Sequence, residues 1–272
     1  MLKTRVLTAI PIALLALALI FLAPAWVFRL AMAALWMIGS WEFARLSGLG
    51  QIPRWILVVL QAAILTLMYS NWSSISGHAL SFLVAAVLAW CVMLLRLLNY
   101  RPRQTAGLNY RMLSFFSALA GITFAWFSLS WLRDQPSNEF LILMLLFIIW
   151  ASDIGAYFSG KQFGRHKLAP SISPGKTREG LLGGLLLAVL TAWVLASVTT
   201  TLDRVPLALI LVTLITTMAA AAGDLFISLH KRTVGMKDSG KLFPGHGGVL
   251  DRFDSLLAGA PFFALGVLLL TL

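Results

Sequence analysis

A succession of long apolar runs, separated by short connections, constrains this chain more than any other feature. Helical runs of about 20 apolar residues match the thickness of a bilayer's hydrocarbon layer. We place them at residues 6–23, 26–46, 55–71, 78–98, 112–132, 140–159, 181–199, 205–228 and 255–272. The runs do not alternate apolar and polar residues, as the strands of a transmembrane barrel would. The predicted fold class is therefore an all-α polytopic integral membrane protein with about nine transmembrane helices.

The distribution of positive charge predicts how these helices are oriented. The N-terminus and the loops 47–54, 99–111, 160–180 and 229–254 fall on one side of the membrane. That side collects every Lys and Arg except Arg29, Arg133 and Arg204. Short loops rich in Lys and Arg stay in the cytoplasm, so we expect a cytoplasmic N-terminus. The excess of 21 basic over 10 acidic residues is thus a topology signal, and nucleic acid is not needed to explain it.

Polar residues divide the chain into two parts. Residues 1–135 hold about five spans with few polar residues inside them. The first apolar run is longer than that of a usual signal peptide, so we expect an uncleaved helix. Glu42 is interpreted as a helix-end carboxylate paired with Arg45, three residues on. Residues 136–272 carry the two long cytoplasmic loops, 160–180 and 229–254, and form the predicted catalytic region.

The segment 150–180 places an acid inside a span and cations beyond it. Asp153 lies in an otherwise apolar helix, which favours a functional role, although it could instead be a buried partner of Lys161 or Arg165. Lys167, Lys176 and the hydroxyl of Ser173 follow among glycines and prolines. Such a surface, close to the start of the next helix, is typical of phosphate binding. The sequence Gly-Lys-Thr alone is not a P-loop, because the earlier glycine and the preceding strand are missing.

The segment 221–255 concentrates the remaining polar chemistry. Asp224, Ser228 and Lys231 are spaced i, i+4, i+7 and share one face of a helix. Arg232, Lys237, His246, Gly247, Gly248, Asp251, Arg252 and Asp254 follow. Asp251 and Asp254 lie at the start of the last helix, where free N–H groups favour negative charge. His246 is interpreted as a phosphate contact or as a donor to a backbone carbonyl, while metal ligation is less favoured because no second His or Cys is near.

Acids beside many cations suit one kind of chemistry. Carboxylates can hold Mg²⁺, which bridges them to substrate phosphates, and the cations neutralise the remaining phosphate charge. Glycines let the backbone approach the anion. These are the components of phosphoryl or nucleotidyl transfer. The alternative, in which acids and bases merely pair at helix ends, does not explain the glycines or His246.

The run SLHKRTVGMKDSGKLFPGHGGVLDRFDS (228–255) resembles the signature of the phosphatidate cytidylyltransferases, also called CDP-diacylglycerol synthases. The matching positions are Ser228, Lys231, Arg232, Lys237, Asp238, Pro244, His246, Gly247, Gly248, Asp251, Arg252 and Asp254. The segment 153–180 is similar to the family's preceding loop. Two positions depart from the pattern: Ile227 stands where members often carry Glu, and His230 stands where they carry an apolar residue.

The resemblance implies that CTP and phosphatidate are converted to CDP-diacylglycerol and pyrophosphate, with Asp224 and Asp251 as ligands of a Mg²⁺ ion and a second cation left open. It implies a bacterial inner-membrane enzyme whose active site faces the cytoplasm. The expected partners are CTP, phosphatidate and the bilayer, with no nucleic acid, and a homodimer is left open. We assign to catalysis Asp224, Asp251, Lys237, His246, Arg252 and Asp254. We assign to substrate binding Asp153, Lys161, Lys167, Ser173, Lys176, Ser228, Lys231, Arg232, Gly247 and Gly248.

Two other functions remain open. A CTP-dependent lipid kinase acting on a long-chain alcohol would transfer the γ-phosphate and would need a base, for which Asp153 or Asp254 could serve. A non-enzymatic anion transporter would also place basic loops beside membrane acids. It predicts symmetry between the two halves, which the sequence does not show.

Overall fold

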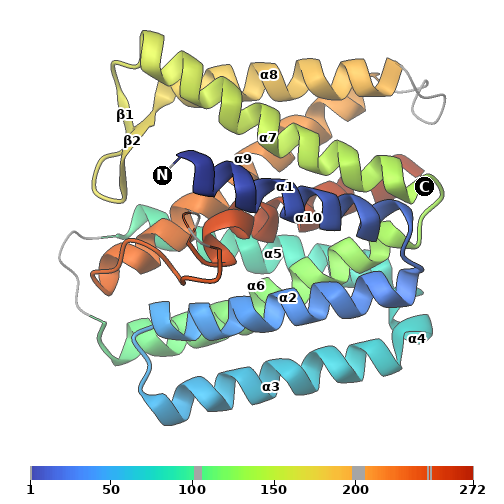
Figure 1. Ribbon diagram of the computed structural model, residues 1–272, viewed down its shortest axis with the longest axis vertical. Helices are drawn as coiled ribbons and strands as arrows, with labels where there is room; N and C mark the ends of the chain where they lie inside the picture. Colours follow the sequence, from blue (N-terminus) through green and yellow to red (C-terminus); the bar gives the residue numbers. More distant parts are fainter. Residues whose placement is uncertain (1, 101–105, 198–205, 244, 246, 272) are drawn as a thin grey trace.

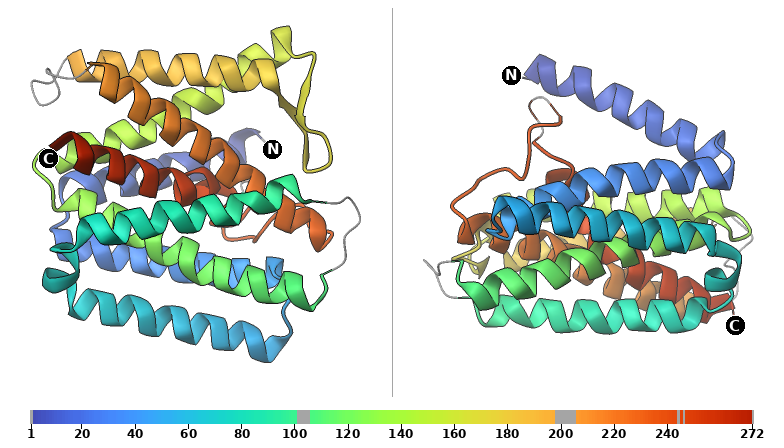
Figure 2. Two further views of the ribbon diagram at one scale, coloured as in Figure 1. Left: turned by 180° about the vertical axis from the view of Figure 1, so that it is seen from behind. Right: turned by 90° about the horizontal axis from the view of Figure 1, so that it is seen from below.

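The computed structural model describes residues 2–100, 106–197, 206–243, 245 and 247–271. Its helices are α1 (Leu2–Phe21), α2 (Ala25–Leu46), α3 (Gln51–Ser70), α4 (Trp72–Ser76), α5 (Ala79–Leu98), α6 (Leu108–Arg133), α7 (Asn138–Phe163), α8 (Arg178–Ser197), α9 (Pro206–Thr233) and α10 (Leu250–Thr271). They form a bundle in which the long helices run roughly along one direction (Figures 1 and 2).

Eight of the described helices are long and apolar enough to cross a membrane: α2, α3 and α5–α10. These eight coincide with eight of the predicted spans, so a polytopic helical membrane protein is confirmed. The remaining predicted span, 6–23, coincides with α1, which has 20 residues. Whether α1 also crosses the membrane, and with it the total of about nine spans, stays a prediction.

A short β-hairpin interrupts the otherwise helical chain. Strands β1 (Lys167–Ala169) and β2 (Ser173–Thr177) are antiparallel, and Lys167 pairs with Thr177. The hairpin stands at the end of the α7–α8 pair in Figure 1. The predicted loop 160–180 is therefore partly ordered as strands, a difference from a purely helical fold. The hairpin ends where α8 begins, which fixes Lys176 close to the helical bundle.

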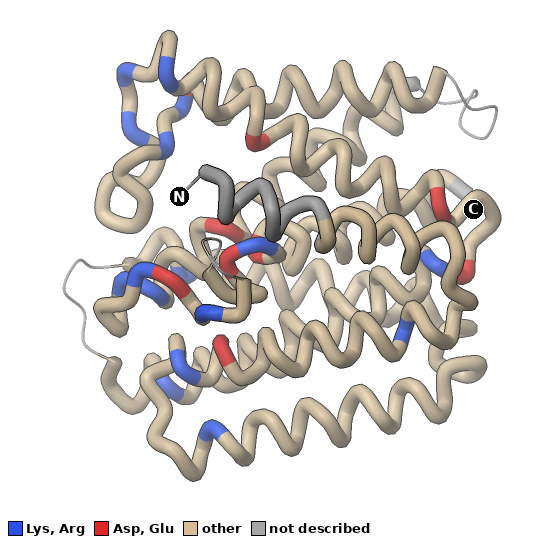
Figure 3. Tube along the Cα trace, in the orientation of Figure 1, with Lys and Arg blue, Asp and Glu red and all other residues tan. Residues whose placement is uncertain are grey.

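Basic residues gather at one end of the bundle. Figure 3 shows Lys and Arg clustered around the hairpin, the loop after α9 and the ends of α2 and α3. At the opposite end, the basic side chains among the described residues are those of Arg29 and Arg133. Both form ion pairs there, Arg29 with Asp134 and Arg133 with Glu139. The charge asymmetry inferred from the sequence is thus present in three dimensions.

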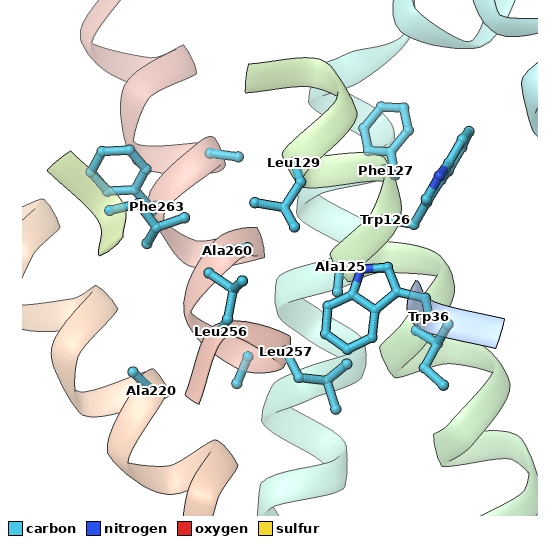
Figure 4. Packing of buried hydrophobic residues seen from close by; sticks show 14 of the residues in the cluster. Trp36, Ala125, Trp126, Phe127, Leu129, Ala220, Leu256, Leu257, Ala260 and Phe263 are labelled. Atoms are coloured by element: carbon cyan, nitrogen blue, oxygen red, sulfur yellow. The ribbon is translucent and has the colours of Figure 1, made fainter. Parts of the chain in front are cut away.

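The core lies where α2, α6 and α10 meet. Trp36 of α2, Ala125 of α6 and Leu257 of α10 are fully buried and lie near one another (Figure 4). Gly39, about one turn beyond Trp36, lies against Val249 and Leu250, and a Cβ at Gly39 would meet their side chains at an ordinary contact distance of 3.5–3.8 Å. This packing holds the end of α2 against the start of α10.

Small residues bring the helices of the second half close together. A Cβ on Gly155 of α7 would lie 2.6 Å from the carbonyl oxygen of Gly183 on α8. A Cβ on Gly223 of α9 would lie 2.8 Å from the carbonyl oxygen of Asp254 on α10. Close approach through glycine is typical of helix pairs in membranes. Consequently Asp224, which follows Gly223, is held on the turn of α9 that faces Asp254.

Candidate functional site

Asp224 is held by groups from its own helix and from the hairpin. Lys176 of β2 reaches α9, and its Nζ lies 2.6 Å from Oδ2 of Asp224 and 3.4 Å from the carbonyl oxygen of Ala221. Ser228, one turn along α9, donates a hydrogen bond of 3.2 Å to Oδ1 of Asp224. The shared helix face inferred from the i, i+4 spacing therefore exists. A phosphate-binding candidate of the hairpin and an acid of α9 belong to one site.

Asp251 is held by the first turn of α10 and the loop before it. Lys231 of α9 lies 3.0 Å from its Oδ1. Its other oxygen, Oδ2, accepts hydrogen bonds from the backbone N–H groups of Ser239 at 2.8 Å and Gly248 at 2.9 Å. The side chains of Lys231 and Asp251 are only 11% and 7% exposed, so the pair is largely shielded from water. One oxygen of Asp251 is thus fixed by the loop, and the other faces the ammonium group.

The two ion pairs form a single electrostatic cluster. The carboxylates of Asp224 and Asp254 repel each other, and the ammonium group of Lys231 attracts both. Lys231 therefore acts on three acids, through direct contact with Asp251 and at longer range with the other two. Within the described ranges, no group of three or more His, Cys, Asp or Glu side chains is arranged to hold a metal ion.

The carboxylates of the site would fit Mg²⁺ only if substrate phosphates supplied further ligands. Mg²⁺ is usually bound by one or two carboxylates, with water and substrate phosphates completing its shell. Asp224 and Asp251 supply such carboxylates, and each already attracts a cation, Lys176 and Lys231 respectively. The electrostatics of the site therefore suit positive charge at both acids.

A cavity of about 240 Å³ opens beside this cluster, between α7, α8, α9 and the hairpin. Its polar lining includes Ser152, Asp153, Tyr157, Lys176 and Thr177. Asp153 is exposed toward it and interacts electrostatically with Asp224 and Lys176. The ammonium group of Lys161, one proposed partner of Asp153, instead lies 5.9 Å from the ring centre of Tyr157. Asp153 thus belongs to the same polar region as Asp224.

Two other predicted residues, Lys167 and Ser173, lie on the hairpin, and Arg232 of α9 contacts it. Lys167 is exposed at the start of β1, and Ser173 is half-buried at the start of β2, opposite Ala169. Arg232 donates a hydrogen bond of 3.2 Å from Nε to the carbonyl oxygen of Ile172, next to Ser173. Arg232 therefore fastens the hairpin to the end of α9, in addition to any role with substrate.

The loop between α9 and α10 presents cations and glycines. Lys237 and Arg252 are exposed. Gly247 has a φ of +84°, a conformation that L-residues rarely adopt, and its carbonyl oxygen accepts a bond of 2.8 Å from the N–H of Phe243. A Cβ at Gly247 would collide with the Asp251 carboxylate, so glycine is needed there for both reasons. His246 and Pro244 lie outside the described residues.

The interpretation of Glu42 as a partner of Arg45 is wrong. Glu42 is 3% exposed, and its oxygens accept hydrogen bonds from Ser239 and from the backbone of the α10 start. A lone carboxylate inside an apolar span was the available signal. These partners lie 197 to 208 residues away along the chain, so the sequence could not identify them.

The two departures from the family signature also have structural settings. Ile227 is fully buried and belongs to the hydrophobic core. His230 is fully buried, and its Nε2 lies 3.3 Å from Nη1 of Arg96. Arginine can only donate, so Nε2 accepts and the ring proton sits on Nδ1, which donates 2.8 Å to the carbonyl oxygen of Phe226. His230 therefore joins α5 to α9 as a neutral acceptor.

The sequence is similar to that of known proteins over nearly its whole length. A family model described as "Cytidylyltransferase family" matches residues 3–270. A phosphatidate cytidylyltransferase of Haemophilus influenzae is 36% identical, over 97% of this chain and 98% of its own length. Proteins of the same name from Pseudomonas aeruginosa and Bacillus subtilis are 37% and 32% identical, over 97% and 96% of this chain and 96% and 95% of theirs.

Proposed function

This chain belongs to the cytidylyltransferase family, and we propose that it forms CDP-diacylglycerol and pyrophosphate from CTP and phosphatidate. The observation that carries the proposal is the pairing of two acids with two lysines where β2, α9 and α10 meet. Phosphate transfer needs cations for the phosphate charge and acids for a divalent ion, close together. The catalytic region proposed is residues 136–272, which supply all four of these side chains.

The reaction needs no general base from the protein. A phosphate oxygen of phosphatidate attacks the α-phosphorus of CTP, and the bond from that phosphorus to the oxygen bridging to the β-phosphate breaks. The nucleophile is already largely ionised, since the second pKa of a phosphate ester is about 6. Pyrophosphate leaves with the bridging oxygen. The protein therefore contributes positioning and charge stabilisation, the effects that dominate phosphate-transfer catalysis.

We assign the phosphate charges to Lys176 and Lys231. Lys176 lines the cavity and contacts Asp224, so it can move a short distance from the acid to an incoming phosphate. Lys231 is more deeply buried and contacts Asp251. Asp224 and Asp251 would hold Mg²⁺, which would neutralise phosphate charge and polarise the α-phosphoryl group when bound. Asp254 lies close enough to Asp224 for the two carboxyl groups to interact electrostatically.

We place this site on the cytoplasmic side of the membrane. The hairpin, the loop before α10 and most of the basic side chains lie at the same end of the bundle (Figure 3). The positive-inside rule assigns that end to the cytoplasm, where CTP is available. The cavity is lined by Tyr157 and Leu181, which are at least partly exposed, as well as by Asp153 and Lys176. An embedded lipid can thus present its headgroup to the lysine without leaving the bilayer.

The test is a reconstituted assay with defined products. The full chain in lipid nanodiscs is incubated with CTP labelled at the α-phosphate, Mg²⁺ and phosphatidate. Transfer of label to the lipid phase with equimolar pyrophosphate is expected. Empty nanodiscs and samples without phosphatidate are the controls. Release of CDP with phosphorylation of an added long-chain alcohol would replace the proposal with a lipid kinase, and no turnover with either acceptor would refute it.

A further inference from the structure

Glu42, on α2, is a buried carboxylate that accepts hydrogen bonds from the loop before α10 and from the start of that helix, next to Asp251. Oε1 accepts the N–H of Val249 at 2.9 Å, and Oε2 accepts the N–H of Leu250 at 2.9 Å. Oε2 also accepts the hydroxyl of Ser239 at 2.7 Å. The three donors are uncharged, and two are free N–H groups at the start of α10, where the helix dipole favours negative charge.

The loop is shaped to enclose this carboxylate. A Cβ placed on Gly240 or on Gly248 would collide with the oxygens of Glu42. On the α2 side, Gly39 lies against the side chains of Val249 and Leu250. The segments 239–240 and 248–250 therefore close around Glu42 from two directions. Such an enclosed carboxylate, with both oxygens hydrogen-bonded, fixes the loop far more tightly than an exposed helix cap would.

The same segments hold Asp251. The backbone N–H of Ser239 and the N–H of Gly248 both donate to Oδ2 of Asp251. The Ser239 hydroxyl lies 3.0 Å from that oxygen and 2.7 Å from Glu42. A hydroxyl has a single proton, so the shorter contact to Glu42 is its donated bond. Glu42 thereby sets the position of Ser239, and Ser239 sets one oxygen of Asp251.

We propose that Glu42 is a positioning residue for the transfer reaction. It locks the segments 239–240 and 248–250, so that Oδ2 of Asp251 is held by the loop and Oδ1 is directed at Lys231 and the reacting phosphates. This inference rests on the function proposed above. Glu42 acts through Ser239 and the start of α10 and does not contact the substrate. The first half of the chain thus contributes one side chain to the geometry of the site.

Glu42→Gln is the direct test. Glutamine has the same shape, but its amide NH₂ would face one of the two backbone N–H groups, leaving two donors opposed. The loop must then shift, and a displacement of about 1 Å in a catalytic group costs up to about 100-fold in rate. We expect kcat per folded molecule to fall by about 10- to 100-fold, while the KM for CTP stays within about threefold because Lys176 and the cavity are untouched.

Two further variants separate positioning from stability. Ser239→Ala removes only the bridging hydroxyl and should lower kcat by about tenfold, again with little change in KM. Gln61→Leu is the matched control, because Gln61 is equally buried and bonds Thr123 between α3 and α6, away from the site. It should lower the thermal midpoint and leave kcat unchanged. Binding of labelled CTP at equilibrium provides a readout that does not depend on turnover.

The outcomes are distinguishable. An inactive wild-type protein refutes the proposed function itself. An active wild type, with kcat within twofold in both Glu42→Gln and Ser239→Ala, overturns the positioning role. So does a loss of kcat in Gln61→Leu equal to that in Glu42→Gln, because both would then reflect stability alone. If Glu42→Gln yields no folded protein, Ser239→Ala decides the matter by the same criterion.

Discussion

Replacing Lys176 with methionine tests whether this lysine serves the substrate more than the fold. Methionine keeps most of the length and volume of the side chain but removes its charge. In the structure, the Lys176–Asp224 pair is partly exposed, with side-chain exposures of 29% and 27%. Exposed or partly exposed ion pairs contribute about 0–1 kcal/mol to stability. We therefore expect Lys176→Met to fold normally and to lose at most about 1 kcal/mol of unfolding free energy.

The expected loss of CTP binding is larger. A hydrogen bond to a charged group contributes about 1.5–3 kcal/mol. At about 1.4 kcal/mol for each factor of ten, the KM for CTP should rise by about 10- to 150-fold. Most of this effect should appear in KM, provided that Lys176 contacts a phosphate in the bound substrate as well as in the transition state.

Lys231→Met is the matched comparison. Its pair with Asp251 is far less exposed, at 11% and 7%. Removing one partner of a buried pair typically costs about 3–5 kcal/mol, because the remaining charge is left uncompensated. This variant should therefore lose stability as well as activity, whereas Lys176→Met should lose activity alone.

The assay combines two measurements on protein in one detergent. Initial rates of label transfer at varied CTP give KM and kcat, and SDS titration followed by tryptophan fluorescence gives relative stability. An unchanged KM for CTP in Lys176→Met would remove this lysine from the phosphate site. Equal losses of stability in the two lysine variants would show that the burial argument is wrong.

Two further predictions concern the acids of the site and its departure from the family pattern. Asp224→Asn and Asp251→Asn should each abolish CDP-diacylglycerol formation and weaken Mn²⁺ binding measured by electron paramagnetic resonance. Asp224→Asn should keep the wild-type thermal midpoint within a few degrees, because its pair with Lys176 is partly exposed, whereas Asp251→Asn should lower the midpoint, because it leaves the buried Lys231 uncompensated. Near-normal turnover in either variant would exclude that residue as a metal ligand. Ile227→Glu should reduce the yield of folded protein, because it buries an unpaired carboxylate in the apolar core. A stable variant with raised kcat would show instead that an acid at position 227 reaches the site.

The membrane-spanning part of the fold could be predicted because one physical requirement determines it. Apolar length sets where a helix crosses the bilayer, and the predicted runs overlap α2, α3 and α5–α10. Helix ends were less predictable: α9 extends to Thr233, beyond the predicted end at 228, since polar residues continue the helix outside the bilayer. The hairpin at 167–177 was missed because its strands are short and polar and carry no apolar alternation.

The site could be predicted where its contacts are local in sequence. The i, i+4 spacing placed Ser228 beside Asp224, and the bond between them follows from helix geometry. Lys176 pairs with Asp224 and Lys231 pairs with Asp251, in each case between two different elements. The sequence could therefore predict that these residues belong to one site, but it could not predict which lysine pairs with which acid. His230 departs from the family pattern, and its structural role depends on Arg96 of α5, which is distant in the sequence. The sequence alone could not explain this residue.

Glu42 shows why the division into an apolar first half and a catalytic second half is incomplete. The start of α10 lies within the bundle, against α2, and its free N–H groups need an acceptor that water cannot readily supply. A carboxylate on α2 meets this need, and glycines at 240 and 248 make room for it. The same loop donates hydrogen bonds to Asp251, so under the positioning role proposed for Glu42 a displacement of α2 would reach the acid through Ser239. The geometry of the acids therefore depends on packing among α2, α6 and α10, and a substitution at buried Trp36 that loosens this packing should lower kcat without touching the polar cluster.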